Sequence, residues 1–428
     1  MREAGMASIN TLQNAVNGKN FENISLRLYG YTPFFNTRKR FLDLLSAHTA
    51  RYAARDAMFF SSPGRIEIAG NHTDHNSGKV VAAAISVDTL AAVTKTDNGV
   101  IRISSRGFPE CIVDAHDPGE PLMADFGDAS SIIKGVCRYY KDSGYKVGGF
   151  DATTVSNVFK GAGVSSSSAF EMLIAEILNA LYNDSKIDNL TKATAGRYAE
   201  NVYFGKPSGL MDQTAIALGG INMIDFENTV PSYRHMTWNF QNLDIYIVNT
   251  GGDHSDLTSD YSAIRGDMNA VAAFFGKQVL REVDPKDFWK DIPALREKLP
   301  GRAVLRALHF FEENNRVEQL ERAVESVDEA SFLSVINASG LSSQVLLQNL
   351  HTPKDYNQPV DVGVELTKRV QGVRAVRVHG GGFAGTILAF VDKRRSKGYY
   401  DYIKSVFGEQ NVFNVSIRND GATLVPLW

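Results

Sequence analysis

The feature that most constrains this fold is a Gly/Ser loop that runs directly into an amphipathic helix. The segment begins at Val158 and reads VFKGAGVSSSSAFEMLIAEIL. After the serines, apolar residues recur at the spacing of one helical face, at Phe170, Leu173, Ile174, Ile177, Leu178 and Leu181. This stripe predicts a buried helix face. Ser168 and Glu171 also have the spacing of a capping box at the start of the helix.

A loop of this kind can bind phosphate. Because it lacks bulky side chains, its backbone N–H groups can reach phosphate oxygens, and the helix N-terminus adds a partial positive charge. Serine hydroxyls can also ligate Mg²⁺. The alternative is a flexible Gly/Ser turn, and the lack of a GxxxxGK(S/T) pattern excludes an ordinary P-loop.

The chain changes pattern twice along its 428 residues, a length that predicts two or three domains at ~150 residues each. A polar, helical part is expected to end at Pro63 and Gly64, and the apolar runs IEIAG, VVAAAIS, LAAVTKT and VIRISS then predict a mixed sheet. A strand from Leu243 opens the second half, which continues with long helices and the unit VRAVRVHGGGFAGTILAFV. We therefore expect an α+β protein with a helical extension (1–60) and two domains (61–240 and 241–428).

Composition excludes several classes of protein. The 45 Lys and Arg residues against 48 Asp and Glu residues give a net charge of −3, which argues against a dedicated nucleic-acid binder. Cys111 and Cys137 can form neither a disulfide framework nor a zinc site of known spacing. The N-terminus lacks an apolar signal region, and the apolar stretch from Val80 is too short to span a bilayer. We expect a soluble, cytoplasmic protein that binds neither nucleic acid nor membrane.

A polar loop separates two of the apolar strands and reads PGRIEIAGNHTDHNSGKVV from Pro63. Its polar side chains lie at a strand end, where they can converge on a hydroxyl-rich ligand. The alternative is a polar turn whose Asn and Asp side chains cap their own backbone. His72 and His75 are three residues apart, but metal ligation lacks a third ligand of known geometry.

Two further segments carry candidate chemistry. Glu200 and Asp212 flank Gly-Lys-Pro-Ser-Gly, so that Asp212 could accept a proton from a sugar hydroxyl while Glu200 holds a metal; each could instead be a solvated or capping residue. The glycines of HGGGFAG fit GxGxxG, the pattern of a dinucleotide fold. Because the apolar run TILAFV that follows predicts a strand rather than a helix, a tight strand–strand connection is the better interpretation.

In this order and spacing, the segments resemble the GHMP small-molecule kinases and, among them, the galactokinases. That family carries GRxNLIGEHTDYNGG, GLSSSA, PCGIMDQ, RAxHVVxENxRV and GGGFGG. Here the corresponding segments are GRIEIAGNHTDHNSG, GAGVSSSSAF, KPSGLMDQ, RALHFFEENNRV and GGGFAG. The resemblance covers about residue 60 to the C-terminus. It implies a first domain like domain 2 of ribosomal protein S5, a ferredoxin-like second domain and an active site between them.

The resemblance implies phosphorylation of the C1 hydroxyl of galactose, with ATP and Mg²⁺. Position by position, Asp212 would be the catalytic base or orienting carboxylate, with Arg65 beside it, and Ser167 and Glu200 would bind Mg²⁺. Contacts to the sugar would come from Asn71, His72, Asp74, the backbone of Gly209, and Tyr261. The ATP phosphates would be wrapped by Gly161, Ala162, Gly163, Val164, Ser165, Ser166, Ser167 and Ser168. The family behaviour implies a monomer, with a dimer as the alternative.

The sugar loop departs from the family pattern at two positions, because Asn71 and His75 stand where the family has Glu and Tyr. The family Glu is expected to bind the C6 hydroxyl, and Asn keeps a donor and an acceptor there without the negative charge. Galacturonate, L-arabinose and N-acetylgalactosamine are therefore alternatives to galactose. A sugar- and ATP-binding regulator without turnover is a further alternative, which the full-length serine loop, Asp212 and Arg65 disfavour.

Overall fold

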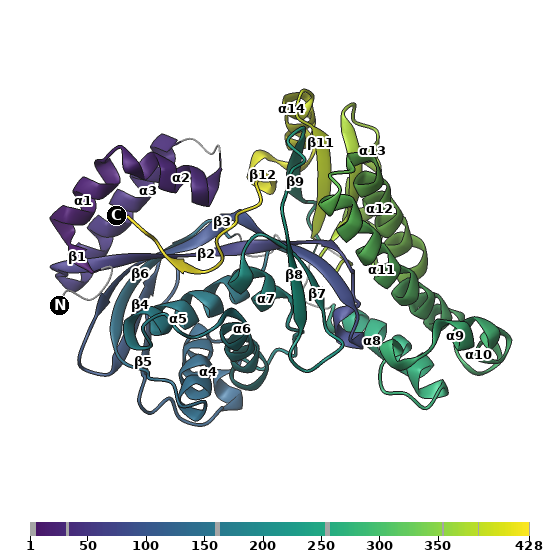
Figure 1. The fold of residues 1–428 in the computed structure, drawn as a ribbon, viewed down its shortest axis with the longest axis horizontal. Coiled ribbons are helices and arrows are strands. Elements are labelled where there is room, and N and C mark those ends of the chain that lie inside the picture. Colours follow the sequence, from purple (N-terminus) through teal and green to yellow (C-terminus); the bar gives the residue numbers. More distant parts are fainter. Residues whose placement is uncertain are drawn as a thin grey trace.

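A computed structural model describes residues 6–30, 34–158, 163–252, 257–352, 355–383 and 385–427. Within these residues the strands form a larger sheet of nine strands and a smaller sheet of four (Figure 1). The larger sheet contains β1 (Ala7–Ser8), β2 (Asp56–Ala69), β3 (Lys79–Lys95), β4 (Val100–Ser105), β5 (Cys111–Asp114), β6 (Phe150–Ser156), β7 (Ile221–Asp225), β8 (Ser232–Met236) and β13 (Thr423–Leu424). The smaller sheet contains β9 (Leu243–Asn249), β10 (Val373–His379), β11 (Thr386–Asp392) and β12 (Val412–Val415).

The larger sheet is mixed, as expected from the sequence. Its order is β1-β2-β3-β6-β4-β5, and β4 and β6 are parallel. The expectation that Pro63 and Gly64 end the N-terminal part is wrong, because both lie inside β2. The pairing of β2 with β3 shifts register between these two residues, and this irregularity accommodates a proline that cannot donate a hydrogen bond within a strand.

The smaller sheet is antiparallel, in the order β10-β11-β9-β12. The strand expected from Leu243 is β9, and the glycine loop joins β10 to β11, with His379 paired to Thr386. The interpretation of HGGGFAG as a strand–strand connection is thus confirmed.

Helices cover both faces of the larger sheet (Figure 1). On one face lie the helices expected within residues 1–60, which are α1 (Ile9–Asn17), α2 (Asn20–Tyr29) and α3 (Phe34–Tyr52). They form a core of their own, in which the ring of Phe41 packs 5.0 Å from Phe21 and 4.9 Å from Phe59. The other face carries α4 (Ala129–Asp142), α5 (Ser166–Tyr182), α6 (Asn189–Tyr198) and α7 (Met211–Leu218).

Helix α5 is the one that the apolar stripe predicts, and Leu173, Ile174 and Ile177 are buried. The predicted capping box is wrong, because Ser165 precedes the helix and Ser168 lies within its first turn. Ser165 has a left-handed backbone (φ 62°) and makes no side-chain cap.

The remaining helices belong to the second half of the chain. They are α8 (Thr258–Phe274), α9 (Pro285–Lys290), α10 (Ile292–Lys298), α11 (Gly301–Glu325), α12 (Glu329–Ser342), α13 (Pro359–Lys368) and α14 (Ser396–Phe407). Among the described residues, Glu329–Leu347 alone has the length and apolar composition of a membrane span, and 44% of its apolar window is buried. It packs against α11 and β10, as a core helix does.

Buried polar contacts join the two sheets. Arg377 of β10 is fully buried and donates to the carbonyl oxygen of Ile68 at 2.7 Å and to Glu67 at 3.0 Å. The backbone N–H of Gly70 donates to Glu313 of α11 at 2.9 Å. This joint holds the end of β2 and the loop that follows it against β10 and α11.

Candidate active site

An arginine–aspartate pair lies at the centre of the candidate site. Arg65 of β2 binds Asp212 in the first turn of α7 through two parallel bonds, of 2.7 Å from Nε and 2.9 Å from Nη2. The hydroxyl of Ser165 also donates to Asp212. Burial acts to raise the pKa of Asp212, but the Arg65 guanidinium and these hydrogen bonds outweigh it and hold the pKa below its ordinary value. Asp212 is therefore ionised at neutral pH.

Asp74 provides a second carboxyl group near Asp212. It lies in the sugar loop, the polar segment between β2 and β3, and a Cβ at Gly209 would overlap its carboxylate. Only glycine at position 209 lets Asp74 approach the backbone so closely. Burial and the Asp212 carboxylate raise the pKa of Asp74 to about 6. The two acids therefore differ in their readiness to accept a proton.

Three residues predicted to contact the sugar converge on the glycine loop, residues 379–385. Asn71 Nδ2 donates to the carbonyl of Gly380 at 2.8 Å, His72 Nε2 to that of Gly381 at 2.9 Å and the Tyr261 hydroxyl to that of Gly382 at 3.0 Å. The rings of His72 and Tyr261 are stacked at 6.4 Å. Since His72 Nε2 is bound to a carbonyl, it is not free to ligate a metal beside His75.

Glu200 lies beside Ser167, as the metal-site prediction requires. The Ser167 hydroxyl donates to Glu200 at 3.2 Å. Three further groups bind the same carboxylate, namely Lys206 Nζ at 2.7 Å, the Ser208 hydroxyl at 2.6 Å and Gln213 Nε2 at 3.0 Å. None of these three is among the site residues predicted from the sequence. The signal was present, because all three belong to the KPSGLMDQ segment around Asp212.

The donor set at Glu200 fits Mg²⁺. A carboxylate and a hydroxyl are oxygen ligands, and Mg²⁺ is usually held by one or two carboxylates together with substrate phosphates. The described residues contain no group of three or more His, Cys, Asp or Glu side chains able to hold a metal alone. A cation at Glu200 would thus depend on phosphate oxygens for its other ligands.

The predicted phosphate loop is described in part, because Gly161 and Ala162 lie outside the described residues. Gly163 to Ser168 turn into α5, and Gly163 has a left-handed backbone (φ 64°). Its carbonyl accepts a bond from Arg65 Nη1. A Cβ at Gly163 would lie 2.9 Å from the Thr386 hydroxyl and 3.4 Å from His379 Nδ1, so the phosphate loop passes close to His379 and Thr386 on either side of the glycine loop.

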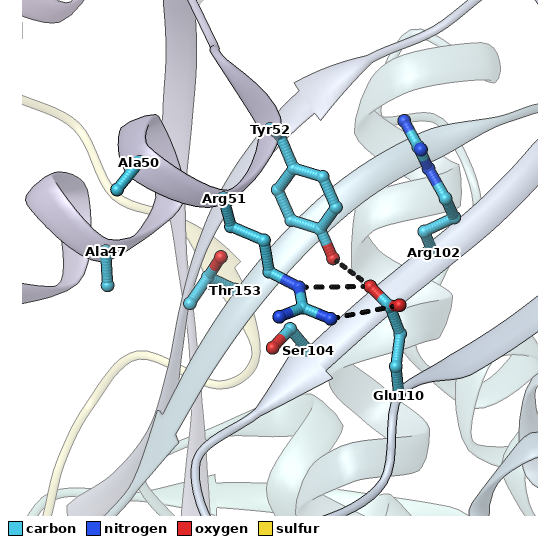
Figure 2. Close-up of a pocket in the computed structure, with 8 residues that line it drawn as sticks. All are labelled: Ala47, Ala50, Arg51, Tyr52, Arg102, Ser104, Glu110 and Thr153. Carbon is cyan, nitrogen blue, oxygen red and sulfur yellow. Dashed lines mark hydrogen bonds and ion pairs between the residues drawn. The ribbon is translucent and has the colours of Figure 1, made fainter.

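A groove of about 610 Å³ lies elsewhere, where the end of α3 meets β4 and β6 (Figure 2). It is lined by Ala47, Ala50, Arg51, Tyr52, Arg102, Ser104, Glu110 and Thr153, none of which was predicted to be functional. Arg51 and Tyr52 both bind Glu110, at 3.1 and 3.0 Å, and Arg102 binds Asp151 at 2.6 Å. Since both of these guanidinium groups are neutralised, the described lining of the groove offers no free positive charge to a phosphate.

Family models match two parts of the chain that contain residues of this site. Residues 46–95 match the galactokinase galactose-binding signature and residues 131–220 the GHMP kinase N-terminal domain. The chain is 30% identical to a galactokinase of Ligilactobacillus salivarius over 362 residues, which cover 83% of this chain and 90% of the relative. It is 29% identical to a galactokinase of Streptococcus suis over 360 residues, with the same coverage of 83% and 90%.

Solved structures show the same fold. The galactokinase of Lactococcus lactis, complexed with galactose, superposes with a TM-score of 0.77 at 24% identity, covering 89% of this chain and 99% of that one. The mevalonate kinase of Methanococcus jannaschii superposes with a TM-score of 0.60 at 15% identity, covering 84% and 98%. The GHMP kinase fold implied by the motifs is thus confirmed, and with the relative at 30% identity it follows that the chain belongs to the galactokinase family of the GHMP kinases.

Proposed function

We propose that this protein is an ATP-dependent sugar kinase that transfers the γ-phosphoryl group of ATP to the C1 hydroxyl of galactose. The observation that carries the proposal is the Arg65–Asp212 pair, held between the sugar loop and the turn into α5. An acceptor hydroxyl bound at Asp212 would face a phosphate held at this turn. Phosphoryl transfer depends mainly on such positioning and on charge neutralisation.

Asp212 orients the C1 hydroxyl and accepts its proton late in the transfer. A carboxylate whose pKa is lowered by Arg65 is a weak base, so it takes the proton only as the new O–P bond forms and the hydroxyl becomes acidic. Arg65 stabilises the negative charge that develops beside it.

The nucleotide phosphates bind at the turn from Gly163 to Ser168 together with Gly161 and Ala162. Ser167 and Glu200 would hold Mg²⁺, which when bound would neutralise phosphate charge. Lys206, at 2.7 Å from Glu200, adds a positive charge on the same side.

The sugar lies against Asp74, the backbone of Gly209, His72 and Tyr261. Asp74 is placed to accept hydrogen bonds from sugar hydroxyls, and the rings of His72 and Tyr261 lie nearly parallel beside it, with centroids 6.4 Å apart. We also propose that the protein acts as a cytoplasmic monomer, and that a boundary near residue 240 separates a first domain (61–240) from a second (241–428).

The test is phosphorylation of a sugar panel, read by mass spectrometry with ATP and Mg²⁺ present. We expect turnover on galactose to exceed that on galacturonate, L-arabinose and N-acetylgalactosamine. Preference for another of these sugars would contradict galactose as the substrate. Sugar binding without any turnover would contradict the kinase and favour a regulator.

Asp212→Asn tests the catalytic assignment. Loss of the proton acceptor should lower kcat at least ~100-fold, while ATP binding measured by calorimetry stays within about twofold. The matched control is Asp225→Asn, because Asp225 also pairs with an arginine, Arg281 at 3.0 Å, but lies outside the site. Wild-type turnover in D212N would refute the role of Asp212.

A further inference from the structure

The glycine loop is held in place by side chains that are predicted from the sequence to contact the sugar. The carbonyls of Gly380, Gly381 and Gly382 are consecutive, and each accepts one bond, from Asn71, His72 and Tyr261 respectively. These donors come from the sugar loop and from α8. The contacts therefore fix the position of the glycine loop relative to the sugar loop.

Asn71 differs from the other two in being completely enclosed, with none of its surface exposed. Besides the bond to Gly380, its Nδ2 donates to Glu67 at 3.0 Å. Its Oδ1 accepts from Asn349 at 2.8 Å and from Ser343 at 3.2 Å. An amide offers two donor hydrogens and two acceptor lone pairs, so every group of this side chain is bound to protein.

The surroundings also determine which way the amide faces. Nδ2 lies against two acceptors, Glu67 and the Gly380 carbonyl, while Oδ1 lies against two donors. Glu67 is itself fixed by Arg377 at 3.0 Å. A carboxylate at position 71 could not donate to either acceptor and would face Glu67 with a like charge.

The position of the glycine loop in turn affects the position of the reacting groups. His379 at its start accepts a bond from the backbone N–H of Glu67 at 3.1 Å, two residues along β2 from Arg65. Gly163 of the phosphate loop lies so near that a Cβ added there would be 2.9 Å from the Thr386 hydroxyl and 3.4 Å from His379 Nδ1. The carbonyl of Gly163 accepts from Arg65, and Arg65 holds Asp212. A series of bonds and close neighbours therefore links Asn71 to the phosphate loop and to the Arg65–Asp212 pair.

We infer that Asn71 is a positioning residue, which holds the glycine loop and through it the phosphate loop in register with Asp212, and that it does not bind the sugar. This inference rests on the proposed sugar kinase function. It predicts that changes at Asn71 act on the transfer step rather than on sugar affinity.

The first experiment is Asn71→Asp, which keeps the shape of the side chain and removes its donors. We expect kcat to fall about 10- to 100-fold, the effect of a misplacement of about 1 Å in the reacting groups, with the KM for sugar changed less than about threefold. The matched control is Asn222→Asp. Asn222 is also fully buried and donates to a glycine carbonyl, that of Gly219 at 2.7 Å, but it lies in β7 outside the site. A rise in sugar KM at unchanged kcat in N71D would overturn the inference.

The double variant E67Q/N71D separates positioning from stability. The amide introduced at position 67 removes the like charge and can donate to the carboxylate introduced at position 71, so thermal stability should recover. The bond to Gly380 stays absent in this variant, and kcat should therefore stay low. Recovery of kcat together with stability would show that Asn71 has only a structural role.

Hydrogen exchange gives a readout that does not need turnover. Deuterium uptake over residues 379–390 of the free enzyme should be faster in N71D than in wild type by about threefold or more, since a loop with fewer bonds opens more often. N222D should leave it unchanged, and unchanged uptake in N71D would overturn the inference. If the wild-type enzyme phosphorylates no sugar in the panel, the proposed function fails while this measurement still decides the role of Asn71.

Discussion

At the scale of single residues, Asp74 should make sugar binding depend on pH. Burial and the Asp212 carboxylate raise its pKa to about 6, so Asp74 becomes protonated as the pH falls through that value. A protonated carboxyl loses an acceptor for sugar hydroxyls, and the KM for sugar should therefore rise below about pH 6 while the KM for ATP stays constant. Asp74→Asn should raise the sugar KM about tenfold at pH 7, the loss of a hydrogen bond to a charged group, and abolish the pH dependence. A sugar KM that stays flat from pH 7 to pH 5 in the wild type would contradict this.

The sequence allowed the residue types of the site to be predicted, but not all of their bonds. Arg65 and Asp212 stand in motifs whose chemistry is recognisable, and the structure brings them into direct contact. The partners of Asn71 and Tyr261 could not be predicted, because they are carbonyl groups of a loop 309 and 121 residues away. A motif shows that a side chain can donate, whereas only the tertiary fold determines which acceptor it meets.

At the scale of elements, a buried ion pair fixes the N-terminal helices to the larger sheet. Asp88 of β3 is completely buried and binds Arg40 of α3 at 2.5 Å and the Tyr29 hydroxyl of α2 at 2.8 Å. Arg418 lies 3.7 Å away and is also buried. Asp88→Asn would leave two guanidinium groups without their counter-ion, so we expect a loss of about 3–5 kcal/mol in the free energy of unfolding, measured with urea.

The control for this prediction is Asp43→Asn. Asp43 pairs with Lys39 on the outer surface of α3, and both side chains are 63% exposed. Removing such a pair should change stability by less than about 1 kcal/mol. Equal effects of D88N and D43N would show that the buried pair does not attach α3 to the sheet.

Helices and strands with a clear hydrophobic pattern in the sequence could be predicted. Features that depend on tertiary contacts could not. The stripe from Phe170 predicted α5, and the apolar run from Leu243 predicted β9. The predicted cap at Ser168 is wrong because the helix begins earlier, after Ser165, whose hydroxyl binds Asp212 instead of capping the helix. The predicted end at Pro63 is wrong because no sequence pattern reveals the register shift that keeps β2 continuous. The packing of α1 to α3 on one face of the larger sheet likewise has no local signal.

At the scale of the whole molecule, the two sheets are joined by a core that they share and by buried charges. One hydrophobic cluster includes Val81 and Ala83 of the larger sheet together with Leu388 and Phe390 of the smaller. Glu313 is one of the buried acids of this joint, together with Glu67. It accepts from the backbone of Gly70 in the sugar loop at 2.9 Å, and from Arg316 at 2.6 Å. The stability of the joint should therefore depend in part on the ionisation of Glu313.

Glu313 should make unfolding sensitive to acid. Burial acts to raise its pKa, but His309, Arg316, Arg377 and the Ser339 hydroxyl lower it to about 2, from an ordinary 4.5. A carboxyl whose pKa is lowered by folding stabilises the protein above its ordinary pKa, and this stabilisation is lost as the pH falls from about 4.5 to about 2. The ionised Glu313 carboxylate should contribute about 3 kcal/mol to the free energy of unfolding over that range.

The variant Glu313→Gln should therefore unfold at lower urea concentration at pH 7, and its stability should depend less on pH in acid. Glu325→Gln, at the exposed end of the same helix, should keep the wild-type slope. Identical slopes for E313Q and the wild type would show that the joint does not depend on this charge.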